Sequence, residues 1–218
     1  KLKVDVIEAG FAASSPGDWE GVNLIAKNIK NSTIASLARC VADDIDQAWE
    51  AIKVANNSRI HVFTSTSDIH MEHMLRKTKE EVLEDARESV KYAKKLCDNV
   101  EFSAQDATRT DKDFLIEILK VAVEEGATTI NVPDTVGYAT PSDYLELLTG
   151  VYDEVKGKNE DIIISTHCHN DLGLAVANSL TAITAGARQI EGAINGIGER
   201  AGNTSTEEII MAVKTRQD

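Results

Sequence analysis

Short apolar runs rich in valine and isoleucine alternate along the chain with longer segments in which apolar positions recur every three or four residues. The short runs predict buried strands, and the longer periodicity predicts helices with one apolar face. Seven strands are predicted in this way: Val4–Ala9, Thr33–Leu37, Arg59–Thr64, Asn99–Ser103, Thr128–Val132, Asp161–Thr166 and Arg188–Ile194. The helices predicted between them include Asp44–Ala55, Thr78–Leu96, Asp111–Glu125, Ser142–Lys156 and Leu174–Ala185.

Repeated strand and helix units with nearly continuous apolar strands indicate a parallel sheet covered by helices. Gly126 and Gly186 each follow a predicted helix and are expected to be left-handed caps. An open doubly wound sheet and a closed barrel both fit this series. Polar residues follow almost every strand, which favours a barrel, because a barrel gathers side chains from many strand ends at one mouth.

A closed barrel of this type requires eight strands, but only seven are predicted. We therefore expect one α/β domain over residues 1–218, a TIM-type (β/α)8 barrel that lacks the first strand and helix. The chain has no G-x-G-x-x-G motif after the first strand and no P-loop motif, so dinucleotide and P-loop nucleotide binding lose their main support.

The charge balance and the cysteines limit the partners and the compartment. The chain has 23 Lys and Arg against 36 Asp and Glu, a net charge of −13, which argues against nucleic acid as a partner. No apolar run is long enough to predict a membrane span. The three cysteines, Cys40, Cys97 and Cys168, are an odd number without a C-x-x-C spacing, so we expect a reducing compartment, the cytoplasm.

The segment from His167 to Asp171 follows one predicted strand and carries the most distinctive chemistry. Because side chains alternate along a strand, His167 and His169 face the same way and Cys168 turns to the other side, so one cation could take both imidazoles. A glycine-rich turn with Glu199, Arg200 and Asn203 follows another apolar run. The two polar sets are predicted to share one site.

Each of these residues also has a plainer interpretation. The two histidines could be solvated or part of the core, and His61 could be a packed core histidine. Glu199 and Arg200 could form a surface ion pair, and Asn203 could only shape a turn. Asp134 and Thr135 could cap a helix.

Four segments together resemble the 2-isopropylmalate synthase family, among the metal-dependent Claisen-condensing and lyase barrels, and the resemblance spans essentially the whole chain. They are Glu8–Phe11, Asn131–Tyr138, His167–Leu174 and Asn195–Thr204. The resemblance implies condensation of acetyl-CoA with 2-oxoisovalerate, which gives 2-isopropylmalate and CoA in leucine biosynthesis. We also expect a homodimer.

The resemblance further implies roles for individual residues. His167, His169 and Asn203 match the family's ligands for a divalent metal, and imidazole with amide and carboxylate oxygens suits Mg, Mn or Zn. Glu199 matches a catalytic glutamate near the acetyl group. The oxo-acid pocket is matched by His61, Ser103, Gln105 and Thr135, although the family usually has glutamate where this chain has Gln105.

Some parts of the family pattern have no counterpart in these 218 residues. An aspartate ligand and a carbonyl-polarising arginine on the first strand would precede Lys1, and the C-terminal regulatory domain is absent. We therefore expect a catalytic-domain fragment that is inactive by itself. The alternatives are a citramalate or homocitrate synthase that uses another 2-oxo acid, and a non-catalytic metal-binding or scaffold fragment.

Overall fold

The computed structural model describes residues 3–156, 159 and 161–216. Within these ranges, seven strands form and are hydrogen-bonded in the order of the sequence, with β1 at one end of the order and β7 at the other. The strands are β1 Val6–Glu8, β2 Thr33–Arg39, β3 Ser58–Ser65, β4 Val100–Gln105, β5 Thr129–Asp134, β6 Ile163–Cys168 and β7 Gln189–Glu191. All seven predicted strands are confirmed, with ends that shift by a few residues.

All five predicted helices form, together with further helices that the pattern did not single out. The longer helices are α1 Pro16–Asn28, α2 Ala42–Ile52, α4 Lys79–Leu96, α5 Lys112–Glu124, α6 Pro141–Glu154, α7 Ala175–Thr184 and α8 Thr206–Thr215. The short ones are α3 Asp68–His70, η1 Met71–Leu75, η2 Ala107–Arg109 and η4 Ile194–Gly196. The glycine caps are also confirmed, since φ is +109° at Gly126 and +100° at Gly186.

Residues near the helix starts explain where several helices begin. Ser15 caps α1 by accepting a hydrogen bond from the Asp18 amide (3.1 Å), and Pro16 occupies the first turn, where no amide donor is needed. At α4, Thr78 and Glu81 form a reciprocal capping box, so each satisfies an amide that the first turn leaves without a partner. These capping signals are local in the sequence. They fix where each helix begins and therefore how long the loop before it is.

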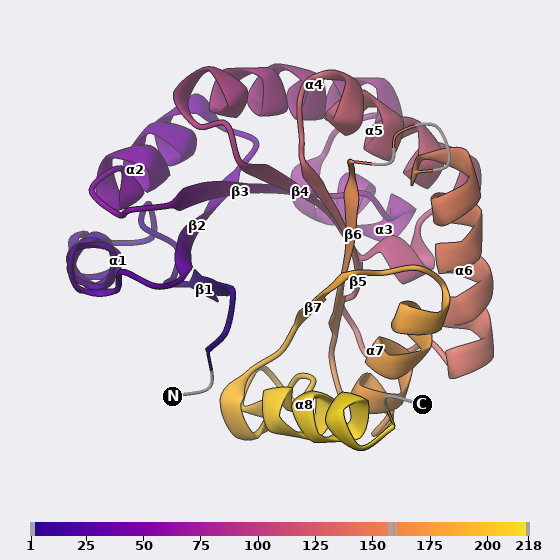
Figure 1. Ribbon diagram of the computed structural model, residues 1–218. Helices are drawn as coiled ribbons and strands as arrows, with labels where there is room; N and C mark the ends of the chain where they lie inside the picture. Colours follow the sequence, from indigo (N-terminus) through magenta and orange to yellow (C-terminus); the bar gives the residue numbers. More distant parts are fainter. Residues whose placement is uncertain (1–2, 157–158, 160, 217–218) are drawn as a thin grey trace. The chain divides into compact units, whose positions relative to one another are not determined.

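The chain divides into two compact units. Unit 1 comprises residues 1–64, 77–103 and 120–129. In unit 1, β1 pairs with β2 and β2 pairs with β3, both in parallel. Figure 1 shows α1 and α2 beside this group of strands, where α2 packs on β2, α1 and α4. The strands of unit 1 bury apolar side chains such as Ile34 and Ile60 completely.

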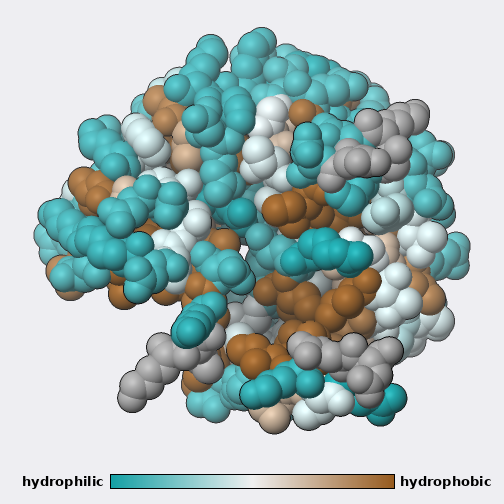
Figure 2. Space-filling view, in the orientation of Figure 1, coloured by the Kyte–Doolittle hydropathy of each residue, from teal (hydrophilic) through white to brown (hydrophobic). Residues whose placement is uncertain are grey.

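Unit 2 comprises residues 65–76, 104–119 and 130–218. Its β6 and β7 pair in parallel, and α7 packs against β6, α6 and α8. The phenol of Tyr144 is fully buried and donates to the Val132 carbonyl oxygen (2.5 Å), which ties α6 to β5. Figure 2 shows apolar side chains gathered around α7 and β7 in this view. On α8, Met211 remains 54% exposed.

No helix in the described part of the chain is long and apolar enough to cross a membrane.

Candidate functional site

The two histidines of the sequence motif lie at the end of β6 in unit 2. His167 is in the strand, and His169 follows it and forms an isolated bridge with Asn203. The two Nε2 atoms are 3.1 Å apart, and Asn203 Nδ2 is 3.4 Å from His167 Nε2. The structure therefore brings the three predicted metal ligands together from two segments that are more than thirty residues apart in the chain.

The glycine-rich turn places Asn203 because its backbone passes too close to itself for larger residues. A Cβ added to Gly202, where φ is +97°, would lie 2.3 Å from the Gly196 carbonyl oxygen. A Cβ added to Gly198 would lie 2.0 Å from Asn203 Oδ1. Both glycines are thus needed for the turn to close and for the amide to stay where it is.

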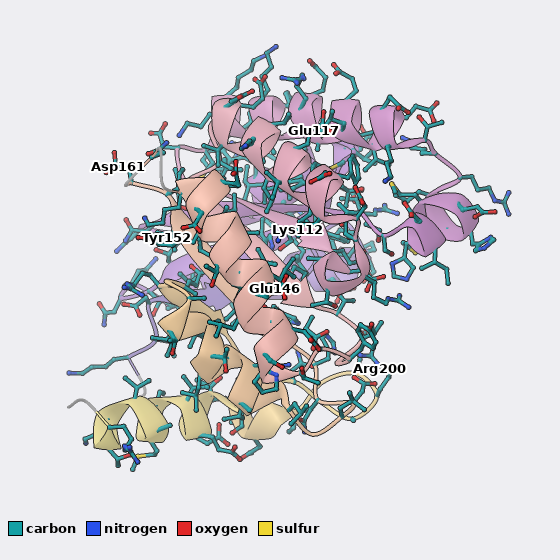
Figure 3. The ribbon with its side chains drawn as sticks, turned by 90° about the vertical axis from the view of Figure 1, so that its right-hand side faces the viewer. Lys112, Glu117, Glu146, Tyr152, Asp161 and Arg200 are labelled. Carbon is teal, nitrogen blue, oxygen red and sulfur yellow. The ribbon has the colours of Figure 1, made fainter. Side chains whose placement is uncertain are left out.

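Arg200 fixes the same turn from outside. Its guanidinium donates two hydrogen bonds to the Asp171 carboxylate, at 2.7 and 2.8 Å, and a third to the Thr135 carbonyl oxygen at 2.9 Å. Figure 3 shows Arg200 in its loop on the side of α6 away from Tyr152. The bidentate bond from Arg200 lowers the pKa of Asp171. Arg200 thus links the glycine-rich turn to the loops after β5 and β6.

Glu199 takes no part in the hydrogen bonds between Arg200 and Asp171. Its carboxylate is 3.6 Å from Arg200 Nη1, whereas Arg200 makes its close bonds to Asp171. The Glu199 side chain is 79% exposed. The interpretation as a plain Glu199–Arg200 ion pair therefore describes the weaker of two contacts that Arg200 makes.

The donor set around His167, His169 and Asn203 fits a divalent metal. His169 Nδ1 and Asn203 Oδ1 are buried and have no hydrogen-bond partner among the described residues. Two ligands about 2.1 Å from one ion, at a tetrahedral or right angle, lie roughly 3.0 to 3.4 Å apart, which matches the spacing of the two ring nitrogens. Burial, and then the nearby His167 and Arg200, lower the pKa of His169 and favour the neutral imidazole that a metal needs.

Thr135 and Gln105, two predicted substrate contacts, also lie in unit 2. Thr135 Oγ1 accepts a hydrogen bond from the Asp106 amide (2.8 Å). Gln105 Oε1 accepts one from Ser65 Oγ (2.5 Å). Each side chain is thus held by a neighbouring strand or loop and keeps hydrogens that can be donated elsewhere.

The interpretation of Asp134 and Thr135 as a helix cap is wrong. The N-cap of α6 is Thr140, which forms a capping box with Asp143. Asp134 is completely buried, and its carboxylate accepts hydrogen bonds from the Tyr138 amide (3.1 Å) and the Ala139 amide (3.2 Å). It therefore shapes the loop between β5 and α6.

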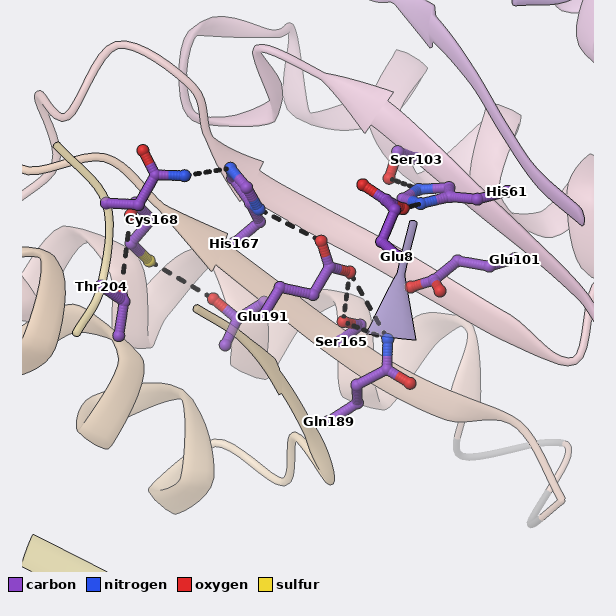
Figure 4. Close-up of polar contacts among 12 residues, drawn as sticks. Glu8, His61, Glu101, Ser103, Ser165, His167, Cys168, Gln189, Glu191 and Thr204 are labelled. Atoms are coloured by element: carbon purple, nitrogen blue, oxygen red, sulfur yellow. Dashed lines mark hydrogen bonds and ion pairs between the residues drawn. The ribbon is translucent and has the colours of Figure 1, made fainter. Parts of the chain in front are cut away.

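Unit 1 holds the other two predicted substrate contacts, His61 and Ser103. The side chain of His61 on β3 is only 4% exposed. Its Nδ1 is 2.5 Å from the Glu8 carboxylate on β1, and its Nε2 is 2.6 Å from Ser103 Oγ on β4 (Figure 4). His61 is buried, as the plainer interpretation held, but its ring lies in a line of polar groups.

Glu191 and the role of Asp171 were not predicted from the sequence. Glu191 Oε2 is 3.1 Å from His167 Nδ1, and Figure 4 shows the carboxylate directed at that ring. A signal was present, because Gln189 and Glu191 interrupt the apolar run Arg188–Ile194 at positions two apart, which share one face of a strand.

Comparison with known proteins then decides the family. The profile of the HMGL-like family matches residues 1–217. The chain belongs to the HMGL-like family.

Curated relatives of this HMGL-like chain are similar along its whole length. It is 57% identical over 218 residues to a 2-isopropylmalate synthase of Clostridium kluyveri and covers 42% of that protein. It is 56% identical over 218 residues to the synthase of Pelotomaculum thermopropionicum and covers 43% of it. In both comparisons the whole chain is aligned. The chain thus spans less than half the length of the curated relatives it matches.

Solved structures show the fold. Hydroxymethylglutaryl-CoA lyase from Pseudomonas aeruginosa has a TM-score of 0.80 at 18% identity, over 98% of this HMGL-like chain and 74% of that structure. An HMG-CoA lyase solved with coenzyme A and 3-methylmalate has a TM-score of 0.78 at 20% identity, over 97% and 72% of the two chains. The predicted TIM-type fold is confirmed, with seven strands among the described residues.

Proposed function

We propose that this chain is the catalytic-barrel part of a 2-isopropylmalate synthase, which condenses acetyl-CoA with 2-oxoisovalerate and releases CoA. The proposal is supported by identities of 56 to 57% to curated synthases over the whole chain. The observation that carries it is the convergence of His167, His169 and Asn203, whose Nε2 atoms and amide lie within 3.1 to 3.4 Å. The coenzyme A in a lyase of similar fold supports a CoA thioester as one substrate.

We assign the metal ligands to His167, His169 and Asn203, and the ion to Mn, Mg or Zn. The buried Oδ1 of Asn203 supports this assignment, because a buried polar atom without a partner among the described residues is costly unless something binds nearby. A divalent ion supplies Lewis-acid polarisation of an oxo-acid carbonyl when it is bound.

The oxo acid is proposed to be oriented by a hydroxyl group, that of Thr135, with Gln105 beside it. Thr135 Oγ1 already accepts from the Asp106 amide, so its own proton is free for a carboxylate oxygen of the substrate. Gln105 accepts a hydrogen bond from Ser65 Oγ at its Oε1, which holds the side chain in place. In unit 1, Ser103 Oγ lies 2.6 Å from His61 Nε2, and both residues are kept as proposed substrate contacts.

Glu199 is proposed as the base that removes a proton from the acetyl methyl group. Its side chain is 79% exposed and its bond to Arg200 is long, so the carboxylate is free to meet a substrate. Arg200 is held by Asp171, and this fixes the backbone from which Glu199 projects. General base catalysis of this kind contributes about 10² to 10⁴ in rate.

We also propose a cytoplasmic homodimer. The three cysteines are free thiols, which agrees with a reducing compartment. The exposed apolar side chains of α8, with Met211 at 54%, offer a surface that a second copy can cover. Light scattering on the purified full-length protein tests this, with a mass of twice the subunit expected.

The direct test is release of CoA thiol by the full-length protein with acetyl-CoA and each of 2-oxoisovalerate, pyruvate and 2-oxoglutarate. We expect kcat/KM for 2-oxoisovalerate to exceed the others by about tenfold or more, since pocket contacts to one or two extra methyl groups supply that much. Preference for pyruvate or 2-oxoglutarate would make the protein a citramalate or homocitrate synthase. Metal binding without turnover of any oxo acid would support the scaffold alternative.

Two variants sharpen the assay. Glu199→Gln is expected to lower kcat by about 100-fold or more while metal content stays unchanged, because the amide cannot accept the proton. Glu146→Gln, on the outer face of α6 (Figure 3), is the matched control and should leave kcat unchanged. The 218-residue chain alone is expected to show no turnover, because the family's aspartate ligand and arginine have no counterpart in it.

A further inference from the structure

Four polar side chains form two directly opposed pairs across β6 and β7. The parallel register sets Ser165 opposite Gln189 and His167 opposite Glu191. Residues two apart on a strand share a face, so all four side chains point to the same side of the sheet. Figure 4 shows Ser165, His167, Gln189 and Glu191 gathered there.

The Glu191 carboxylate is held by this face. Its Oε1 accepts a hydrogen bond from Ser165 Oγ (2.9 Å) and lies 3.4 Å from Gln189 Nε2. Gln189 Nε2 also donates to Ser165 Oγ (3.0 Å), which closes a small network. The other carboxylate oxygen, Oε2, is 3.1 Å from His167 Nδ1. The carboxylate is thus fixed at one oxygen and presents the other to the imidazole.

This contact decides which nitrogen of His167 carries the proton. An ionised carboxylate only accepts hydrogen bonds, so His167 Nδ1 must be the donor. In a neutral ring Nε2 then carries the lone pair, and Nε2 is the atom 3.1 Å from His169 Nε2. His169 has no such support, because its Nδ1 has no partner among the described residues.

We propose that Glu191 is a positioning residue for the metal site: it holds His167 as the Nδ1–H tautomer and aims its Nε2 at the ion. The proposal rests on the metal-binding part of the proposed function. Residues that orient a metal-binding histidine in this way typically contribute about 10 to 100-fold in metal affinity. Ser165 and Gln189 contribute by keeping the carboxylate in place.

The test measures Mn²⁺ binding to the metal-free full-length protein by titration calorimetry. Glu191→Ala should weaken binding by about 10 to 100-fold, and Glu191→Gln should recover part of the loss because its amide oxygen still accepts from Nδ1–H. Gln189→Ala should have a smaller effect, since it only loosens the support. Glu146→Gln, an exposed glutamate on another face, should bind Mn²⁺ as tightly as the wild type.

A second measurement reads the tautomer directly, by long-range proton–nitrogen NMR of the histidine rings in the metal-free protein. The wild type and Glu191→Gln are expected to show His167 protonated at Nδ1, and Glu191→Ala is expected to lose that preference. A merely structural role of Glu191 would not move this signal while the circular dichroism stays native. The signals of His169 serve as the internal reference.

The outcomes separate this proposal from the proposed function. Unchanged affinity and tautomer in Glu191→Ala would overturn it, as would a wild type that binds no Mn²⁺. Loss of binding as complete as in His169→Ala would make Glu191 a ligand and not a positioning residue. If the Glu191 variants behave as expected but no oxo acid is turned over, the positioning role stands and the synthase assignment fails.

Discussion

His61 in unit 1 and the pair His167 and His169 in unit 2 differ in the contacts that their ring nitrogens make. In unit 1, both ring nitrogens of His61 are in short contacts, with Glu8 at 2.5 Å and Ser103 at 2.6 Å. In unit 2, two imidazole nitrogens face each other at 3.1 Å, and His169 Nδ1 is buried without a partner among the described residues. An imidazole with both nitrogens in hydrogen-bond contacts is held in one orientation, whereas two imidazole nitrogens that converge on one point can bind a cation.

The largest expected effect is a difference in Mn²⁺ affinity between a variant of His169 and a variant of His61. His169→Ala should weaken Mn²⁺ binding by about 100-fold or more, because it removes a ligand, whereas His61→Ala should change it by less than about threefold. Elemental analysis and calorimetry on the full-length protein provide both values. Equal losses of Mn²⁺ affinity in the two variants would contradict the assignment of the metal site to His169 and not to His61.

A smaller effect is expected from the turn that carries Asn203. In Gly198→Ala the new Cβ would stand 2.0 Å from Asn203 Oδ1, so the amide must move away. Metal affinity should fall by about tenfold, in line with the loss of a well-placed ligand group. Gly21→Ala in α1 is the matched control, since a Cβ there meets nothing within 4 Å. Unchanged affinity in Gly198→Ala would show that Asn203 does not bind the metal.

The ion pair between Arg200 and Asp171 is expected to contribute about 0.5 to 1 kcal/mol to the free energy of unfolding, because the pair is partly exposed. The pKa of Asp171 is lowered by its bond from Arg200, so this stability is present above the unfolded pKa of about 4 and is lost as the pH falls through the lower, folded value. Urea unfolding at pH 7 and in acid tests this. Asp171→Asn should differ from the wild type at pH 7 and converge with it in acid, while the exposed Asp153→Asn should match the wild type throughout.

The smallest effect concerns the departure from the family pattern at Gln105. Its Oε1 accepts a hydrogen bond from Ser65 Oγ, and a carboxylate would accept the same bond. Gln105→Glu is therefore expected to change kcat/KM for 2-oxoisovalerate by less than about threefold, a shift below 1 kcal/mol. A larger change would mean that the donor NH2 group of Gln105 is used by the substrate.

The strands, five of the helices and the common face of His167 and His169 were predicted because they depend on short-range patterns, whereas Asn203 was assigned as a ligand through the resemblance to the synthase family. Strand runs and helix periods are local, and the alternation of a strand puts His167 and His169 on one face. The partners of these residues depend on register instead. Glu191 meets His167 only because β7 pairs with β6 in the register observed, and Arg200 meets Asp171 only because the glycine turn closes.

A long-range contact of Glu8 and the weakly amphipathic helix α1 were also difficult to predict from the sequence. Glu8 could be named from the sequence as a polar group near a strand end, but its bond to His61 spans 53 residues and follows from the sheet. The helix α1 was overlooked although Ser15 and Pro16 mark its start. Its weak apolar face, with Val22 and Ala26 as its buried apolar residues, explains why the periodicity did not single it out.

The most direct test of the account is the anomalous diffraction of manganese in crystals of the full-length protein grown with Mn²⁺. We expect one peak within about 2.3 Å of the Nε2 atoms of both His167 and His169, with Asn203 beside it. A manganese peak bound to the ring of His61 instead, with none between His167 and His169, would contradict it.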